Sequence, residues 1–141
     1  MLIKYVLVMN KSICKTDADG TKHWFLDDKL HRTDGPAIEY ANGDKYWHLN
    51  GKLHRTDGPA IERASGYKAW FLDDKRHRTD GPAIEYVNGY KTWYFNGKCH
   101  RTDGPAVEHA NGGKYWYLDG LQIDCKSQEE FKRLMRLKAF W

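Results

Sequence analysis

A histidine, an arginine and an aspartate recur in this chain within the segment HRTDGPA, which occupies residues 31–37 and returns unchanged at 54–60, 77–83 and 100–106. Histidine and aspartate are common zinc ligands, and they could also transfer protons in an acid–base reaction. Enzymes rarely need four copies of a site, however, and an arginine beside each histidine would repel a bound cation. We therefore interpret the segment as structural and predict no catalytic residue, no metal site and no cofactor.

The spacing of this segment is shared by five tryptophans, so the chain is a repeat. The tryptophans lie 23 residues apart, at Trp24, Trp47, Trp70, Trp93 and Trp116. Each complete unit also has two turn signals, an Asn-Gly or Asp-Asp pair after its tryptophan and an Asn-Gly or Ser-Gly pair before the next one. Asn-Gly is typical of a two-residue type I′ hairpin turn. The pattern predicts an all-β repeat, an elongated single-layer antiparallel sheet of stacked β-hairpin units.

Two-residue turns at both signals would fix how the strands of a unit pair. Each unit is then a three-strand meander, roughly 37–41, 44–49 and 52–55 in one unit, and alternate side chains point to opposite faces. One face would collect Ile38, Trp47, Leu49 and His54, and the other Glu39, Tyr46, His48 and Arg55. We expect the first face, which is apolar in every unit, to be the stacking surface. The second face varies along the chain, and we expect it to bind a partner.

The ends of the repeat define the remaining organisation of a single domain spanning 1–141. Residues 1–12 predict an N-terminal capping strand, 13–123 the repeats, and 124–141 a C-terminal capping helix. Ser127 and Glu130 have the spacing of a helix capping box. Between units, the Asp-Gly-Pro-Ala stretch predicts a corner, in which glycine supplies an unusual backbone angle and proline fixes φ.

Composition limits the classes of function. The net charge of +4 is spread thinly over the units, which argues against binding to duplex nucleic acid. Three cysteines without a CxxC spacing predict neither a disulfide framework nor a zinc site, which is typical of a reducing compartment. The apolar start of the chain is too short to span a membrane. These features predict a cytoplasmic protein with no membrane insertion.

The segment YWHLNGKLHRTDGPAIE, residues 46–62, resembles a divergent unit of the MORN-repeat family. MORN units have about this length and consist of a β-hairpin with a tryptophan, an Asn-Gly-Lys turn and regularly placed glycines. The resemblance covers about residues 13–123, but Lys45 and Arg55 stand where the family favours glycine. It implies a scaffolding or binding module and not an enzyme. The HRTDGPA repeats also resemble those of uncharacterised phage and large-virus proteins, which implies the host cytoplasm as the location if a phage encodes the chain.

We therefore expect a non-catalytic binding module of phage or virus type, which occupies or inhibits a host protein through an aromatic and arginine face. The candidate partner-binding residues are Phe25, Arg32, Tyr46, His48, Arg55, Phe71, Arg78, Tyr94, Arg101 and Tyr117. The alternative is a sequestering binder of nucleic acid or a charged nucleotide, because aromatic rings and arginines also stack with bases. Each repeated arginine has a glutamate at a matching position, so this face is close to neutral. We therefore consider a protein the better hypothesis for the partner. An exposed sheet edge or face would also allow a homo-oligomer.

Overall fold

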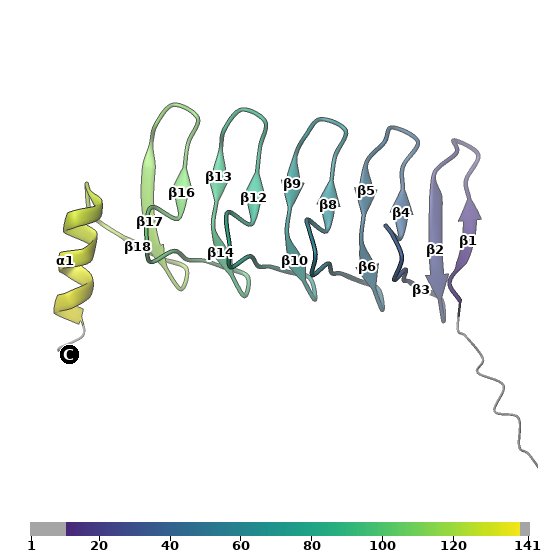
Figure 1. Ribbon diagram of the computed structural model, residues 1–141, viewed down its shortest axis with the longest axis horizontal. Helices are drawn as coiled ribbons and strands as arrows, with labels where there is room; N and C mark the ends of the chain where they lie inside the picture. Colours follow the sequence, from purple (N-terminus) through teal and green to yellow (C-terminus); the bar gives the residue numbers. More distant parts are fainter. Residues whose placement is uncertain (1–10, 139–141) are drawn as a thin grey trace, which may run out of the picture.

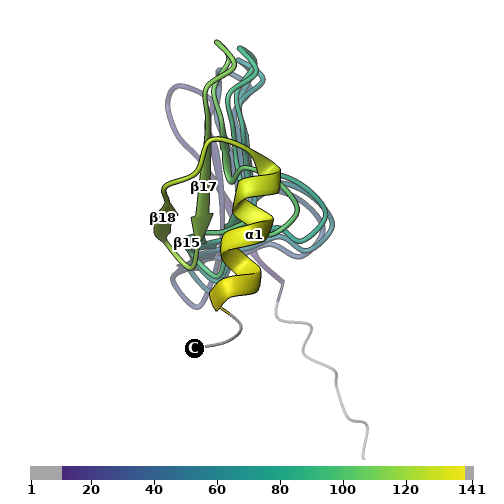
Figure 2. The ribbon, with the colours of Figure 1, turned by 90° about the vertical axis from the view of Figure 1, so that its left-hand side faces the viewer.

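The computed structural model describes residues 11–138, which form a long row of β-hairpins closed at one end by a helix (Figure 1). The largest sheet is antiparallel and has 12 strands in the order β1-β2-β4-β5-β8-β9-β12-β13-β16-β17-β18, with β3 paired to β2. In the view along the row, the hairpins superpose and make a single layer (Figure 2). The predicted fold class, an open all-β repeat with one C-terminal helix, is confirmed.

The elements are β1 (Ile13–Thr16), β2 (Lys22–Leu26), β3 (Lys29–Leu30), β4 (Ile38–Glu39), β5 (Lys45–Tyr46), β6 (His48–Leu49), β7 (Lys52–Leu53), β8 (Ile61–Glu62), β9 (Lys68–Ala69), β10 (Phe71–Leu72), β11 (Lys75–Arg76), β12 (Ile84–Glu85), β13 (Lys91–Thr92), β14 (Tyr94–Phe95), β15 (Lys98–Cys99), β16 (Val107–Glu108), β17 (Lys114–Leu118), β18 (Leu121–Ile123) and α1 (Gln128–Lys138).

Each unit contributes two hairpins. The upper hairpins of Figure 1, such as β4–β5 and β8–β9, join edge to edge in the large sheet, where Tyr46 of one unit pairs with Ile61 of the next. The lower hairpins β6–β7, β10–β11 and β14–β15 are separate two-stranded sheets. Neighbouring lower hairpins are joined by turn amides, as in the 2.8 Å bond from Gly97 N to Arg76 O. Every unit is thus bonded to the next along both hairpins.

The register predicted for the upper hairpin is wrong by one residue. Ile38 pairs with Tyr46 and not with Trp47, because the turn has three residues. Gly43 alone has a positive φ, at 93°, and its N–H bonds the carbonyl of Tyr40 at 2.9 Å. This is a type I turn closed by a left-handed glycine. A shift of one residue exchanges the faces of a strand, so Tyr46 lies beside Ile38 on the face opposite Glu39.

The turn of the lower hairpin is predicted correctly. Asn50 and Gly51 both have positive φ, 51° and 82°, as a type I′ turn requires, and Leu49 pairs with Lys52. The expected continuous strand 44–49, however, divides at Trp47. The Trp47 N–H bonds Ala60 O of the next unit at 2.8 Å, while Trp47 O accepts the N–H of His54 in its own unit at 3.1 Å. The tryptophan is therefore the point at which the chain changes its hydrogen-bond partner.

The apolar core is a thin strip along the sheet. Ile61, Ala69 and Ile84 form its centre, and half-buried side chains pack against them: Tyr46, Leu53, Tyr67, Phe71 and Tyr94. The alanines of the four HRTDGPA segments are completely buried. A strip of this size leaves much of the stabilisation to contacts between units, as in other linear repeats.

The C-terminal end has the predicted capping helix. Ser127 Oγ accepts the N–H of Glu130 at 3.1 Å, and the Glu130 carboxylate accepts the N–H of Lys126 at 2.9 Å, one residue earlier than in the usual capping box. Trp116 donates from Nε1 to Gln128 Oε1 at 2.7 Å and is only 5% exposed. The helix thus covers the tryptophan that has no following HRTDGPA segment.

At the N-terminal end, residues 1–10 of the predicted capping strand lie outside the described residues, and the first strand there is β1, paired with β2. Within residues 11–138 there is no helix with the length and apolar character that crossing a bilayer requires.

Candidate functional site

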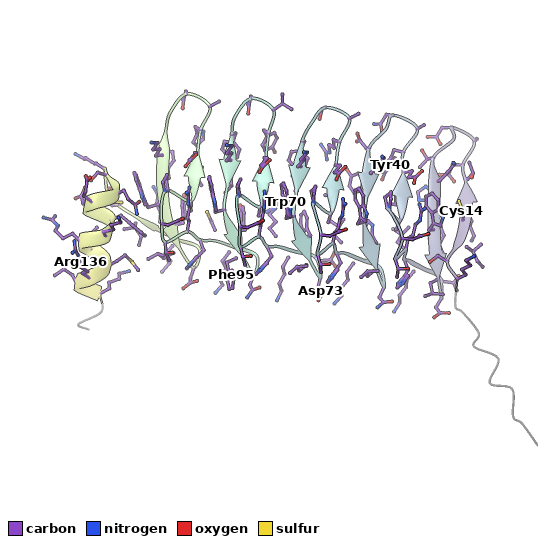
Figure 3. The ribbon with its side chains drawn as sticks, in the orientation of Figure 1. Cys14, Tyr40, Trp70, Asp73, Phe95 and Arg136 are labelled. Atoms are coloured by element: carbon purple, nitrogen blue, oxygen red, sulfur yellow. The ribbon has the colours of Figure 1, made fainter. Side chains whose placement is uncertain are left out.

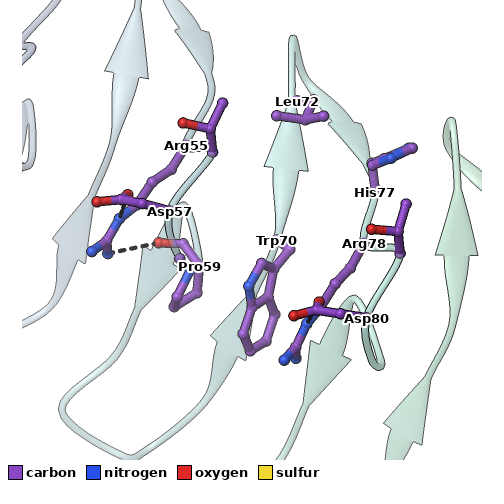
Figure 4. Close-up of a pocket in the computed structure, with 11 residues that line it drawn as sticks. Arg55, Asp57, Pro59, Trp70, Leu72, His77, Arg78 and Asp80 are labelled. Atoms are coloured by element: carbon purple, nitrogen blue, oxygen red, sulfur yellow. Dashed lines mark hydrogen bonds and ion pairs between the residues drawn. The ribbon is translucent and has the colours of Figure 1, made fainter.

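The repeated arginine is the centre of a network at each corner between units. The guanidinium of Arg78 lies 3.8 Å from the ring centroid of Trp70, a cation–π contact. Its Nε donates to Asp80 at 2.8 Å, and its terminal nitrogen donates to Pro82 O at 3.0 Å and to Glu85 at 2.8 Å. Figure 4 shows Trp70 between Arg78 and Pro59 of the preceding unit. We call this set of contacts the corner network.

The corner network is the same in all four complete units. The arginine-to-tryptophan distances are 3.8–4.0 Å, and the Nε-to-aspartate distances are 2.7–2.8 Å. The hydrogen bond from each arginine lowers the pKa of its aspartate from the ordinary value of 3.8. The arginines are Arg32, Arg55, Arg78 and Arg101, each with a side chain about one-fifth exposed. These guanidinium groups are therefore committed to contacts inside the protein.

Glycine occupies its position in the corner for a different reason from the one predicted. Gly81 does not adopt a left-handed φ, unlike the turn glycines. A Cβ atom on Gly81 would instead lie 2.8 Å from the Arg78 Cζ, and the equivalent distances in the other units are 2.7–2.9 Å. The expected unusual backbone angle is thus wrong for this position. Glycine is favoured here because any Cβ atom would force the guanidinium to shift.

The repeated histidine connects one unit to the turn of the next. Nδ1 of His77 accepts the backbone N–H of Asn96 at 3.1 Å, and His31 and His100 make the same bond to Asn50 and Asp119. The residue that donates this N–H is in each case the first central residue of the type I′ turn, where φ is positive. No group of three metal-ligating side chains occurs among residues 11–138. The histidine, the arginine and the aspartate of HRTDGPA therefore have structural partners.

The predicted partner-binding residues do not lie on one face. The four corner arginines bond the glutamates, which alternate with the isoleucines and lie on the opposite face of the sheet. Phe71 and Tyr94 pack against the isoleucine strip, and the Tyr117 hydroxyl bonds Gln122 at 3.2 Å. Phe25 and His48 are likewise half-buried. Only Tyr46 belongs to the aromatic surface described next.

The isoleucine face of the large sheet carries a continuous line of aromatic and cationic side chains, one from each of eight successive strands or strand ends. In sheet order these are Tyr40, Tyr46, Arg63, Tyr67, Tyr86, Tyr90, His109 and Tyr115. We call this set the tyrosine row. The ring contacts along it are edge-on, with centroids 4.8–5.5 Å apart, and the Arg63 guanidinium lies 5.0 Å from the Tyr67 ring. Figure 3 shows where Tyr40 begins the row on the upper hairpins.

The tyrosine row is accessible to a partner. Tyr40, Tyr86 and Tyr115 are 39%, 47% and 44% exposed, which is high for such large side chains. An open hollow of about 470 Å³ lies between Tyr86, Tyr90 and His109 and is bordered by Asn88 and Asn111 at the turns. Exposed aromatic surface with adjacent polar groups is typical of protein-binding sites.

Sequence reasoning missed most of this row, including Arg63, Tyr67, Tyr86, Tyr90 and His109. Its signal is present in the sequence, since the residue after the repeated glutamate is Tyr40, Arg63, Tyr86 or His109. The one-residue register error concealed it, because in that register Tyr46 pointed to the glutamate face and away from Tyr40. The correct turn length places these side chains together.

The comparisons identify no relative. The scan against protein-family models finds no match to this chain, and the search of curated proteins finds none either. Evidence about function therefore comes from the geometry of the repeat surfaces.

Proposed function

We propose that this protein is a non-catalytic binding module whose partner is a protein, bound along the tyrosine row. The observation that carries this proposal is the unbroken line of eight side chains across eight strands, three of them tyrosines that are about two-fifths exposed or more. Tyrosine contributes a large contact area at a small cost in conformational entropy, which suits it to protein interfaces. The repeat scaffold holds these rings at regular intervals.

The contacts of the corner arginines also favour the tyrosine row as the binding surface. Each repeated arginine is held at its corner by an aspartate, a glutamate, a proline carbonyl and a tryptophan ring. Using it for a partner would require these contacts to be broken first. We therefore transfer the proposed binding surface from the expected aromatic and arginine face to the tyrosine row.

Two finer parts of the earlier expectation stay proposals. We propose that the units are a divergent form of the MORN hairpin, on the basis of the repeated tryptophan and the type I′ turn. The style of the repeat also predicts that a phage or virus encodes the chain, that its partner is a host protein, and that it acts in the cytoplasm. These stay predictions.

The test is an affinity capture from bacterial extract with matched variants. Tyr86→Ala combined with Tyr115→Ala removes two exposed rings from the row, while Lys91→Ala combined with Lys114→Ala alters exposed side chains on the opposite face of the same sheet. We expect a discrete protein to be retained at high salt by the wild type and the lysine variant, and to be lost from the tyrosine variant. Thermal melting checks that all three are folded.

Equal capture by both variants would contradict the choice of face. Retention of nucleic acid alone, and only at low salt, would contradict a protein partner and favour the alternative function, because phosphate contacts weaken steeply as salt increases.

A further inference from the structure

Two arginines depart from the repeat, Arg63 in the tyrosine row and Arg76 in β11 of a lower hairpin. Arg63 stands where the other complete units have tyrosine or histidine, and Arg76 stands where they have leucine or cysteine. The Arg63 guanidinium lies 5.0 Å from the Tyr67 ring, and that of Arg76 lies 5.3 Å from the Tyr94 ring. Both also lower the pKa of the Tyr67 hydroxyl, although burial raises it by more. Arg63 and Arg76 therefore place two cations against aromatic rings near the middle of the array.

Neither cation is neutralised in the way the corner arginines are. Within residues 11–138, no carboxylate oxygen lies within 4.0 Å of either guanidinium. A hydrogen bond to Tyr46 is the main cause that raises the pKa of Arg63, and Asp44 adds only a smaller electrostatic contribution. Asp44 is itself engaged, because its Oδ1 accepts the N–H of Ala64 at 2.8 Å. The centre of the row is thus complementary to a partner that carries a carboxylate.

The spacing of the units along the tyrosine row matches one backbone conformation of the partner better than the others. Two strands per unit, at about 4.8 Å each, give a repeat of about 9.6 Å along the row. A polyproline II helix advances about 3.1 Å per residue with three residues per turn, so that equivalent side chains recur every 9.3 Å or so. An α-helical turn of about 5.4 Å and a strand repeat of about 6.7 Å do not match. Every third residue of a polyproline II segment would meet the same position in successive units.

The chemistry of the row is also suited to such a segment. A polyproline II backbone has no internal hydrogen bonds, and its carbonyls need donors, which tyrosine hydroxyls and asparagine amides can supply. The hollow between Tyr86, Tyr90 and His109 is lined by rings of the kind against which proline packs in other proline-binding grooves.

We propose that the tyrosine row binds an acidic, proline-rich segment of its partner in the polyproline II conformation, lying across the strands. A carboxylate of the segment lies between Arg63 and Arg76, and a proline fills the hollow beside Tyr90. This inference rests on the proposed function and specifies the partner's chemistry.

The test uses three synthetic peptides labelled with fluorescein, and binding is measured by fluorescence polarisation against the intact chain. The peptides contain four repeats of Glu-Pro-Pro, of Lys-Pro-Pro, or of Glu-Gly-Ser, which has the same charge as the first but a flexible backbone. We expect only the Glu-Pro-Pro peptide to bind. Arg63→Gln combined with Arg76→Gln should weaken this binding by about tenfold or more, as expected for lost charge-assisted contacts. Lys75→Gln combined with Lys98→Gln removes the same charge elsewhere and should leave binding within about twofold.

Equal binding of the flexible peptide would overturn the polyproline II conformation, and equal binding of the lysine peptide would overturn the acidic partner. Failure of all three peptides would overturn the whole inference. If the capture experiment still retains a protein that depends on Tyr86 and Tyr115, the proposed function survives that failure. If it retains none, both proposals fall.

Discussion

The two faces of the sheet use arginine in opposite ways. On the corner side, Arg78 has four partners in the corner network, and the HRTDGPA segment around it repeats without change. On the row side, Arg63 lies against the half-buried Tyr67 ring and is replaced by tyrosine or histidine in the other complete units. The corner must be identical in every unit because each copy makes the same contacts between neighbours. The row can vary because its side chains do not determine how the units stack.

The largest expected difference between the faces comes from removing each arginine. Arg78→Ala leaves a half-buried glutamate and a proline carbonyl without their donor, and it uncovers Trp70. We expect it to lower the free energy of unfolding by about 2–3 kcal/mol, between the values for surface and buried pairs. Arg63→Ala should change it by less than about 0.5 kcal/mol. Urea unfolding of the two variants measures both, and similar losses would mean that the faces do not differ in this way.

A smaller effect is expected from the glycine that supports the corner. A methyl group in Gly81→Ala would lie 2.8 Å from the Arg78 Cζ and must displace the guanidinium from Trp70. We expect a loss of about 1–2 kcal/mol in the free energy of unfolding, typical of overpacking. The loss should largely disappear when Arg78 is already alanine, which a double-mutant cycle tests. An unchanged loss in that background would show that the clash lies with the backbone.

The smallest expected effect concerns pH and the lower hairpin. Burial lowers the pKa of His48 below its usual 6.5, and its Nδ1 has no hydrogen-bond partner in the described part of the chain. Well above pH 6.5 the ring is neutral in both the folded and the unfolded state. Below it the unfolded chain binds a proton more readily than the folded one, so stability decreases as the pH falls.

His48→Phe introduces the residue found at the same position in two other units, Phe25 and Phe71, and should reduce this loss on acidification. Melting temperatures of both proteins between pH 7.5 and 5 measure the difference. Parallel curves would exclude a contribution from His48.

Much of the fold could be predicted from the sequence because its signals are local. The period of the tryptophans, the Asn-Gly and Asp-Asp type I′ turns and the Ser127–Glu130 cap each depend on a few adjacent residues. The repeat architecture follows from their recurrence. The upper turn was the exception, since Asn-Gly is compatible with both a two-residue and a three-residue loop.

The candidate site could not be predicted to the same extent, because it depends on that loop length and on contacts between units. One residue of register decides whether Tyr46 lies beside Ile38 or beside Glu39. The sequence likewise did not predict which groups the arginine side chain contacts. Only the folded corner shows that the guanidinium lies over the Trp70 ring and close to Gly81, where it is engaged in the corner network.

The sequence by itself determined that this chain is a 23-residue β-hairpin repeat with a C-terminal helical cap, since periodicity and turn chemistry act over short distances. Which side chains share a face was decided only by the tertiary structure. The reason is physical, because alternate residues of a strand point to opposite sides and a single extra turn residue exchanges them. The third residue of the upper turn sets the register that brings the side chains of the tyrosine row onto one face.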